Sequence, residues 1–597
     1  AGKLVGTSSS LQGVIDILDS AILGFDQDDD GTFEGVMSGG GDAFKRGAGS
    51  LVLEGTQAAR QVDVYGGGLI VGAASQSSAE LGADIVNVYS GAFLGGHGTV
   101  SSDVVVHAGG RLSPGNSYGI TRIGGDLEFK SGSYFDVEVN PFNTAEGDVA
   151  YVSGTAYLAG IVRHLETGGT ADDYLKAGNE WLILDAADLS GTFDGAVSNL
   201  AFLLPQLRYD DVNADVYLSF VRGGATFADF ADTRNRRSVA AALESLDPGS
   251  VLLTEIAYSG TTVDQVPGLL DDLSGEMHGA VGGGLFQLGR GFANMLSRHV
   301  GGLSRFGSGA PAPAAGSPGQ GGNSFWAVAG GTYTVMKGTG ETARATLTGP
   351  EVSVGYDHVS ADGWLAGLAF QYGYKKMKMG ARSSEAEVNS LTVGLYGGRE
   401  VRLGPGALRV VLSGSYSHHD IDSTRRVFMG TAAQTLEASY SARSFAGDLE
   451  VAYRFPVTGS LSLEPYARIG VQRIRFGGFA ERGGSAALTS LGESWSHAVS
   501  TAGLRLLLAG NDRVSFSADL GWQHTFGNLA PSATYAFREG GSGFTVTGSP
   551  MNRNEALVGL ELGINVTDSV SFQLGYNGSF GSRGQSHGGN AMVEVKW

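Results

Sequence analysis

Three patterns of hydrophobic and polar residues follow one another along the chain. Residues 1–149 alternate apolar and polar side chains over only four to six positions before each run meets glycine, as in Gln61–Tyr65 and Asp103–His107. Strands this short and closely spaced are typical of a β-solenoid, whose turns bury their inward face only against neighbouring turns. Residues 150–225 are richer in large apolar side chains, which predicts a cap over the last turn.

The second pattern, in residues 226–323, is helical. Apolar residues recur at helical spacing in Ser238–Leu246 and again between Ala280 and His299, where glycines occupy much of the remaining surface. These small side chains would let the second helix pass through a narrow space. Residues 307–323 are rich in proline, glycine and serine, which predicts a linker.

The third pattern fills residues 324–597, where long segments alternate between an apolar and a polar face. Val570, Phe572 and Leu574 share one face of such a segment, for example, and Ser571 and Gln573 share the other. Strands that cross a bilayer need this period over about 9–11 residues. Twelve strands are predicted, beginning near residues 324, 349, 363, 387, 407, 437, 460, 493, 512, 553, 569 and 584. Because short and long connections alternate and an even number of strands can close without an edge in lipid, a transmembrane β-barrel is expected.

Composition and charge agree with an extended β protein. The chain of 597 residues contains 97 glycines, no cysteine and only 17% charged residues. The lack of cysteine excludes disulfides, thiol catalysis and Cys-ligated metals. Residues 1–225 carry −18 of the net charge of −20, which argues against nucleic-acid binding. No run approaches 18 consecutive apolar residues, so no transmembrane helix is expected.

Several landmarks occur in a characteristic order. In the third segment they are Glu464–Tyr466, Gly521–Gly527, Phe544–Gly548 and the terminal Trp597. In the first segment, Gly39–Leu53 looks like a short repeat associated with passenger transport. Taken together, the chain resembles the classical autotransporters of type V secretion with a pertactin-like passenger, and the resemblance covers nearly its whole length.

The resemblance implies an all-β fold with a helical linker. It places a right-handed β-solenoid passenger at residues 1–149, an autochaperone-like cap at 150–225, a linker with a lumen helix at 226–323 and a 12-stranded barrel at 324–597. The barrel would lie in outer-membrane lipid with the passenger on the cell surface, and Trp597 would be read by the barrel-assembly machinery. No cofactor is expected.

Asn294 lies on the predicted lumen helix, and some autotransporters release their passenger by self-cleavage at such an asparagine. That chemistry needs carboxylates that polarise the asparagine and exclude competing water. Glu464, Asp519 and Glu594 have the parity of lumen-facing residues and are candidates. The favoured alternative is an electrostatic latch that holds the helix, formed by these acids with the basic residues Arg290, Arg298 and Arg468.

Two motifs in the first segment carry other chemistry. Gly115–Gly119 matches a nucleophile elbow around Ser117, but no helix is predicted to follow, so a turn is expected. Asp26, Asp28 and Asp30 occupy positions 1, 3 and 5 of a calcium loop. Position 12 is Met37 instead of the bidentate glutamate, so an acidic surface loop is expected and a Ca²⁺ site is the alternative.

The absence of a catalytic constellation predicts that the chain is not an enzyme. The expected function is an autotransporter that translocates and anchors its own passenger, which would serve adhesion to an unidentified host or cell-surface ligand. One alternative is the same barrel displaying a hydrolytic passenger. Another is an outer-membrane channel whose solenoid faces the periplasm.

Overall fold

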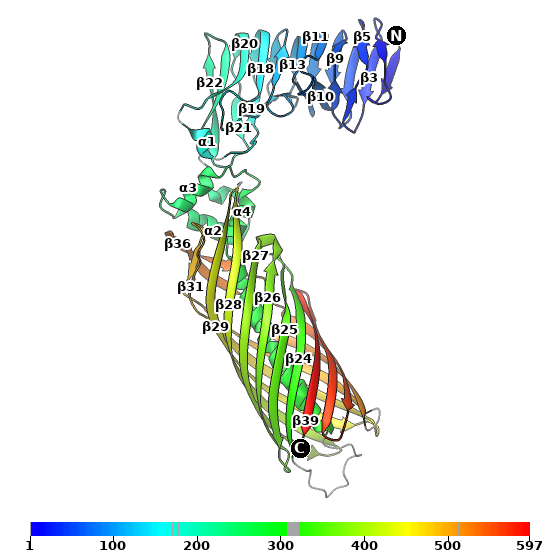
Figure 1. The fold of residues 1–597 in the computed structure, drawn as a ribbon, viewed down its shortest axis with the longest axis vertical. Coiled ribbons are helices and arrows are strands. Elements are labelled where there is room, and N and C mark those ends of the chain that lie inside the picture. The colour runs from blue at the N-terminus through cyan, green and yellow to red at the C-terminus, as the bar shows by residue number, and fades with distance from the viewer. Residues whose placement is uncertain are drawn as a thin grey trace. The chain divides into compact units, whose positions relative to one another are not determined.

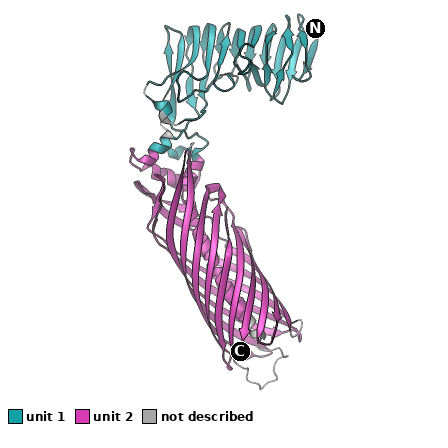
Figure 2. Cartoon of the chain, in the orientation of Figure 1, with its two compact units in different colours: residues 1–229, 254–266, 429–432 teal, residues 230–253, 267–428, 433–597 magenta. Residues whose placement is uncertain are grey.

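The computed structural model describes residues 2–169, 171–176, 178–223, 225–306, 322–430, 432–509 and 513–597. Most of the predicted linker at 307–323 therefore lies outside the described residues. The chain divides into two compact units (Figure 2). Unit 1 contains residues 1–229, 254–266 and 429–432, and unit 2 contains residues 230–253, 267–428 and 433–597.

Unit 1 is built from short strands that follow one another closely. They are β1 (Lys3–Gly6), β2 (Val14–Asp16), β3 (Ile22–Asp26), β4 (Gly31–Phe33), β5 (Val36–Ser38), β6 (Asp42–Arg46), β7 (Leu51–Leu53), β8 (Thr56–Ala58), β9 (Gln61–Val64), β10 (Gly67–Val71), β11 (Glu80–Val88), β12 (Ala92–Gly96), β13 (Thr99–Val106), β14 (Arg111–Pro114), β15 (Ile120–Ile123), β16 (Leu127–Phe129), β17 (Tyr134–Val137), β18 (Val149–Leu158), β19 (Ile161–His164), β20 (Trp181–Gly191), β21 (Gly195–Ser198), β22 (Leu203–Asp210) and β23 (Asp215–Arg222). A short helix, α1 (Ala171–Leu175), precedes β20.

The strands of unit 1 stack in parallel to form the predicted solenoid (Figure 1). One sheet follows the order β1-β3-β6-β9-β11-β13-β15-β18-β20-β23-β22, and a second follows β21-β19-β17-β14-β12-β10-β7-β4. Val62, Val86 and Val104 occupy matching positions in successive turns and are buried together in one core. The stack ends in antiparallel pairs of β20 with β23 and of β22 with β23.

Unit 2 contains the closed barrel that the alternation predicts. Its twelve strands are β24 (Gly322–Met336), β25 (Ala345–Val359), β26 (Trp364–Met379), β27 (Ser384–Leu403), β28 (Gly406–Met429), β29 (Ala432–Pro456), β30 (Leu461–Phe476), β33 (Ser494–Ala509), β34 (Val514–Phe526), β37 (Asn554–Asn565), β38 (Val570–Gly581) and β39 (Gly584–Lys596). β24 pairs with β39 along its length, which closes the barrel. The strands alternate between buried and exposed positions, so one face of each strand lines the lumen and the other faces outward.

Two features of this half of the chain were not predicted. The long connections between barrel strands hold a separate four-stranded sheet of β31 (Phe479–Ala480), β32 (Leu488–Ser490), β35 (Ser532–Phe537) and β36 (Gly540–Thr547). The other feature is the helix α3 (Val251–Tyr258). Along the chain it lies between α2 (Arg234–Glu244) and α4 (Val266–Leu273), which follow η1 (Phe227–Phe230), and η2 (Gly380–Arg382) follows β26.

The longest helix, α5 (Glu276–Phe306), runs through the barrel lumen as predicted (Figure 1). Its apolar side chains pack against the inner wall in two clusters, one around Leu285 and Phe286 and one around Phe292 and Leu296. Among the described helices, none has the length and apolarity that a membrane span requires.

Candidate functional site: the lumen helix and its polar contacts

Glycines let α5 lie directly against the inner wall of the barrel. A Cβ atom at Gly282 would come within 1.4 Å of the Trp495 ring, and one at Gly289 within 2.4 Å of the Gln472 side chain. Gly291 is different, because a Cβ there would meet nothing within 4 Å. Only some of the glycines are therefore required by close packing.

The first turn of α5 is held by a buried ionic cluster. Glu276 accepts hydrogen bonds from the backbone of Ala343 at 2.7 Å and from Arg382 at 2.9 Å. His278 lies 2.9 Å from Glu481, which also binds Arg425 through two guanidinium nitrogens at 2.7 Å each. These contacts tie the start of the helix to the connections that follow β24, β26 and β30.

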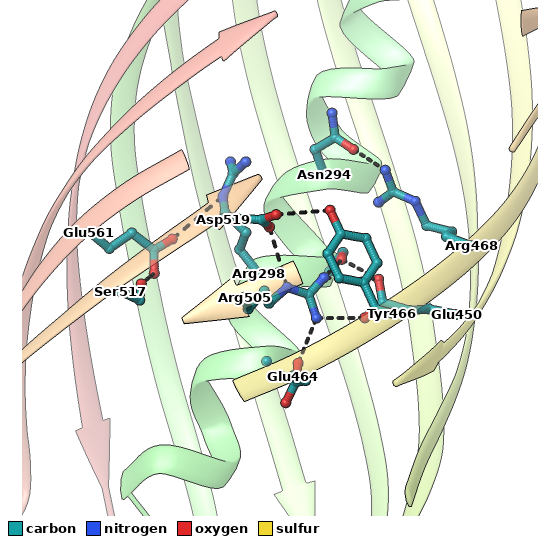
Figure 3. Close-up of polar contacts among 12 residues, drawn as sticks. Asn294, Arg298, Glu450, Glu464, Tyr466, Arg468, Arg505, Ser517, Asp519 and Glu561 are labelled. Atoms are coloured by element: carbon teal, nitrogen blue, oxygen red, sulfur yellow. Dashed lines mark hydrogen bonds and ion pairs between the residues drawn. The ribbon is translucent and has the colours of Figure 1, made fainter. Parts of the chain in front are cut away.

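In the middle of α5, arginines of the helix and an arginine of the barrel wall make the polar contacts. Arg290 of the helix donates to Asp448 of β29 at 2.8 Å. Arg468 of β30 donates to the side-chain oxygen of Asn294 (Figure 3). Arg298, one turn further along the helix, lies 3.5 Å from Glu561 of β37.

The last third of α5 meets the densest charge cluster of the lumen, which is centred on Arg505 of β33. Arg505 binds Glu450 at 2.9 Å, Glu464 at 2.8 Å and Asp519 at 3.3 Å (Figure 3). It also donates to the Ser297 hydroxyl of the helix at 2.7 Å. Glu464 additionally binds Arg409 at 2.6 Å and Arg454 at 2.8 Å. We call these residues, Ser297, Arg409, Glu450, Arg454, Glu464, Arg505 and Asp519, the Arg505 cluster.

The predicted lumen residues fall into different surroundings. Glu464 and Asp519 belong to the Arg505 cluster, and Arg468 contacts Asn294. Glu594 is buried on β39, where it accepts from Ser571 at 3.3 Å and lies 3.4 Å from Lys596. None of the contacts found among the described residues joins one of the three predicted acids to Asn294. Self-cleavage at Asn294 therefore stays a prediction. The ionic contacts join the helix to the barrel wall, which is the arrangement expected of an electrostatic latch.

A cavity of about 130 Å³ lies beside α5 in the lumen. The helix contributes Arg290, Asn294 and Arg298 to its lining, and the wall contributes polar side chains such as Glu351 and Asn577. Polar groups thus surround the helix on this side as well as in the ionic clusters.

About half of the residues that make up the latch were not predicted from the sequence. Asp448, Glu450 and Arg505 share the parity of lumen-facing residues on their strands, and this signal could have found them. Glu481 and His278 lie outside the regular strand pattern, in a connection and at a helix start. Parity carries no information about such residues.

The Asp26–Asp30 loop does not gather its carboxylates around one point. Asp26 binds Arg46 at 2.6 Å, Asp28 accepts from the backbone of Ala48 at 3.1 Å, and Asp30 accepts from the backbone of Ser50 at 2.6 Å. Each carboxylate thus connects one turn of the solenoid to the next. Across the described ranges, no group of three or more His, Asp or Glu side chains is arranged to hold a metal ion.

The serine candidates of unit 1 occupy structural positions. Ser117 lies in a bend with a backbone φ of 129°, and the next element is the strand β15 instead of a helix. Ser198 does lie 2.9 Å from His164, but both are on stacked strands and the imidazole is fully buried. Burial lowers the pKa of His164 to about 3, which makes it a very weak base.

One family model matches most of the barrel. Residues 325–577 match the family model described as Autotransporter beta-domain. The translocator domain of NalP from Neisseria meningitidis is similar over 52% of this chain and 97% of its own, at 15% identity and a TM-score of 0.39. The β-domain of the Bordetella protein BrkA is similar over 46% and 98%, at 20% identity and a TM-score of 0.32.

Two curated relatives extend the similarity into unit 1. Both are named extracellular serine protease and come from Serratia marcescens. One is 26% identical over 93% of this chain and 56% of its own length, and the other is 24% identical over 85% and 52%. The chain therefore spans about half the length of the curated relatives it matches.

These relatives overturn one prediction. The prediction that the chain is not an enzyme is wrong, because both relatives that align with most of it are named as proteases. It failed because it was drawn from the motifs of one sequence, where no nucleophile could be recognised. An adhesive passenger, its pertactin-like character and the cation site stay predictions.

Proposed function

We propose that this chain, whose C-terminal barrel belongs to the autotransporter β-domain family, exports a serine protease passenger to the cell surface. The barrel lies in the outer membrane and the passenger is exposed on the surface. The protease character of the passenger is the finer part of the proposal. The observation that carries it is the similarity of both units, and not of the barrel alone, to extracellular serine proteases.

The contacts of α5 suggest what happens once the passenger has crossed. A helix with glycines at its tightest contacts can enter the lumen, and its polar groups then meet partners at the start, middle and end of the passage. Each buried charge needs its partner, since an unpaired charge in a low-dielectric site is costly. The latch would therefore hold the helix in the lumen and leave the passenger anchored outside.

Assembly with partners is proposed from the ends of the two units. The terminal strand β39 closes the barrel against β24 and would be the segment that the barrel-assembly machinery recognises, together with Trp597. In unit 1, stacking outward from the cap around β20 and β23 would bias movement of the passenger through the membrane without ATP.

A serine-directed fluorophosphonate probe on intact cells tests the protease. We expect the full-length protein to be labelled and the cells to cleave an added peptide substrate. Mass spectrometry of the labelled peptide identifies the nucleophile, and a Ser→Ala variant at that position should lose both label and cleavage.

Trypsin shaving supplies the control that makes a negative result meaningful. If unit 1 is removed by external trypsin while the barrel survives, export has taken place. Absence of both label and peptide cleavage on such cells would refute the protease passenger while leaving the exporter intact.

A further inference from the structure

The outward face of the barrel carries a groove that the lumen contacts do not explain. A cavity of about 500 Å³ lies on this face across β29, β30, β33 and β34. Small residues leave room there between larger exposed apolar side chains. The small residues are Ala446, Gly447, Ser496 and Ala498, and the large ones are Phe445, Val471 and Phe526. We call this feature the outer-wall groove.

Three exposed arginines gather at one end of the outer-wall groove. Arg473 lines it and lies directly opposite Phe445, and Arg475 lies directly opposite Arg443 in the same strand pair. Like charges at directly opposed positions of an antiparallel pair repel each other. Among the described residues, none of the three arginines has an ion pair or a side-chain hydrogen bond.

The neighbouring carboxylates already have partners of their own. On the outward face of β28, Asp420 contacts His418 at 3.2 Å and Asp422 accepts from Ser439 at 2.6 Å. Beyond β30, Glu493 accepts from the backbone of Thr534. The positive charge of the three arginines is therefore not matched by a hydrogen-bonded acid of the protein.

The position of the arginines along the strand places them at the surface side of the membrane. Arg473 and Arg475 lie at the end of β30 that leads to Glu481, the partner of the first turn of α5. Farther down the same strand, Ile469 is 61% exposed, as expected for a lipid-facing residue. An outward arginine is tolerated near the membrane interface and is costly at the midplane. This position at the end of the strand fits the level of the outer-leaflet headgroups.

We propose that the outer-wall groove and its three arginines are a docking site for a phosphorylated, multi-acyl glycolipid of the outer leaflet. Guanidinium groups bind phosphate through paired, charge-assisted hydrogen bonds, and here they would also relieve the repulsion between Arg443 and Arg475. One acyl chain of the same lipid fills the groove between Phe445, Val471 and Phe526. The lipid joins four neighbouring strands on the outside of the barrel.

Native mass spectrometry of the full chain in detergent tests the site, with diphosphoryl lipid A and its dephosphorylated form as probes. The triple variant Arg443→Gln, Arg473→Gln, Arg475→Gln should bind the diphosphoryl lipid about a hundredfold more weakly than the wild type. The matched control replaces three outward cations elsewhere on the barrel, Lys378→Gln, Arg399→Gln, Arg426→Gln, and should bind as the wild type does.

A second variant separates the acyl contact from the phosphate contact. Ala498→Leu fills the groove and keeps all three arginines, so it should weaken lipid binding while a heat-modifiability gel still reports a closed barrel. Wild-type binding by the triple variant, equal binding of the dephosphorylated lipid, or equal loss in the matched control would each overturn the site. Wild-type binding by Ala498→Leu would overturn the acyl assignment.

Discussion

Glu464 accepts from three arginines, Arg409, Arg454 and Arg505, although it is almost fully buried in the lumen. Removing one partner of a buried ion pair leaves the other charges uncompensated, which costs more than the pair itself contributes. Glu464 meets three positive charges at once, and the nearby Glu450 and Asp519 offset only part of them through Arg409 and Arg505. The barrel should therefore be unusually sensitive at this one side chain.

We expect Glu464→Gln to destabilise the barrel by about 3–5 kcal/mol. Glu385→Gln is the matched control, because Glu385 binds Lys376 in a partly exposed pair and should change stability by under about 1 kcal/mol. Urea titrations read by heat-modifiability on gels would measure both. Equal midpoints for the two variants would contradict the role of Glu464.

His164 gives unit 1 a dependence on acid. It is buried against the Tyr174 and Phe220 rings, and its folded pKa of about 3 lies far below the ordinary value of 6.5. The unfolded chain therefore takes up the proton first, so the stability that the neutral imidazole provides is complete above about pH 6.5 and is lost as the pH falls toward 3.

Hydrogen exchange read by mass spectrometry should show this loss in the peptide that contains His164. We expect protection there to fall between pH 7 and pH 5, after correction for the intrinsic exchange rate, and to fall less in His164→Gln. The half-exposed His107, which contacts Asn87, is the control, and His107→Gln should keep the wild-type pH dependence. The same pH dependence in both variants would exclude His164 as its source.

At the scale of the element, α5 combines glycines that the packing requires with glycines that it does not. Alanine stabilises a helix interior by up to about 1 kcal/mol over glycine when nothing obstructs the methyl group. Gly291→Ala should therefore stabilise the helix slightly, since its Cβ would lie in open space. Gly282→Ala should weaken the seating of the helix, because its Cβ would overlap Trp495.

Protease protection of α5 in the purified full chain compares the two substitutions. Gly282→Ala should expose the helix to cleavage at Arg290 or Arg298, whereas Gly291→Ala should leave it protected. Because both residues lie in the same helix and gain the same group, a difference between them reports the wall contact. Equal protection would mean that the wall near Trp495 adjusts.

Element types were predictable where one physical period dominates. Alternation along Val570–Leu574 and similar runs located all twelve barrel strands, because each strand must face both lipid and lumen. The sheet of β31, β32, β35 and β36 was not predicted, because it forms within connections whose sequence has no sustained hydrophobic period. The helix α3 was not predicted for a related reason, because its eight residues are too few to establish a helical period.

The site was predictable only in part, and the missing part has a geometric cause. Parity alone identified Glu464, Arg468 and Asp519 as inward-facing residues. It could not identify which of them meet, because that depends on how neighbouring strands are staggered around the barrel. Arg505 faces Asp519 directly across β33 and β34 and faces Glu464 across β30 and β33. Such pairs become visible only when the registers are known.

At the scale of the whole molecule, the acidic side chains of the two units have different kinds of partner. Most of the net negative charge lies in the solenoid, where acids such as Asp103 and Asp126 accept from the backbone of the following turn. The barrel pairs its acids with arginines inside the lumen. These acids of unit 1 thus link successive turns, whereas Glu464 and its partners link neighbouring strands.

The last prediction concerns whether the solenoid turns fold together on the cell surface. Trp181 is buried in the cap, donates to the Asn140 carbonyl at 2.9 Å and packs against Tyr174 and Phe220. Trp181→Ala should cost about 3–5 kcal/mol locally. If folding spreads from the cap, external trypsin should then cut at the distant Arg60 as well as at Arg208, with the barrel still inserted.

The exposed Trp364 supplies the control, since Trp364→Ala should change neither site. Cleavage confined to Arg208 would mean that the first turns fold without the cap. That outcome is physically possible because each turn contacts only its neighbours, so the first turns can stabilise one another.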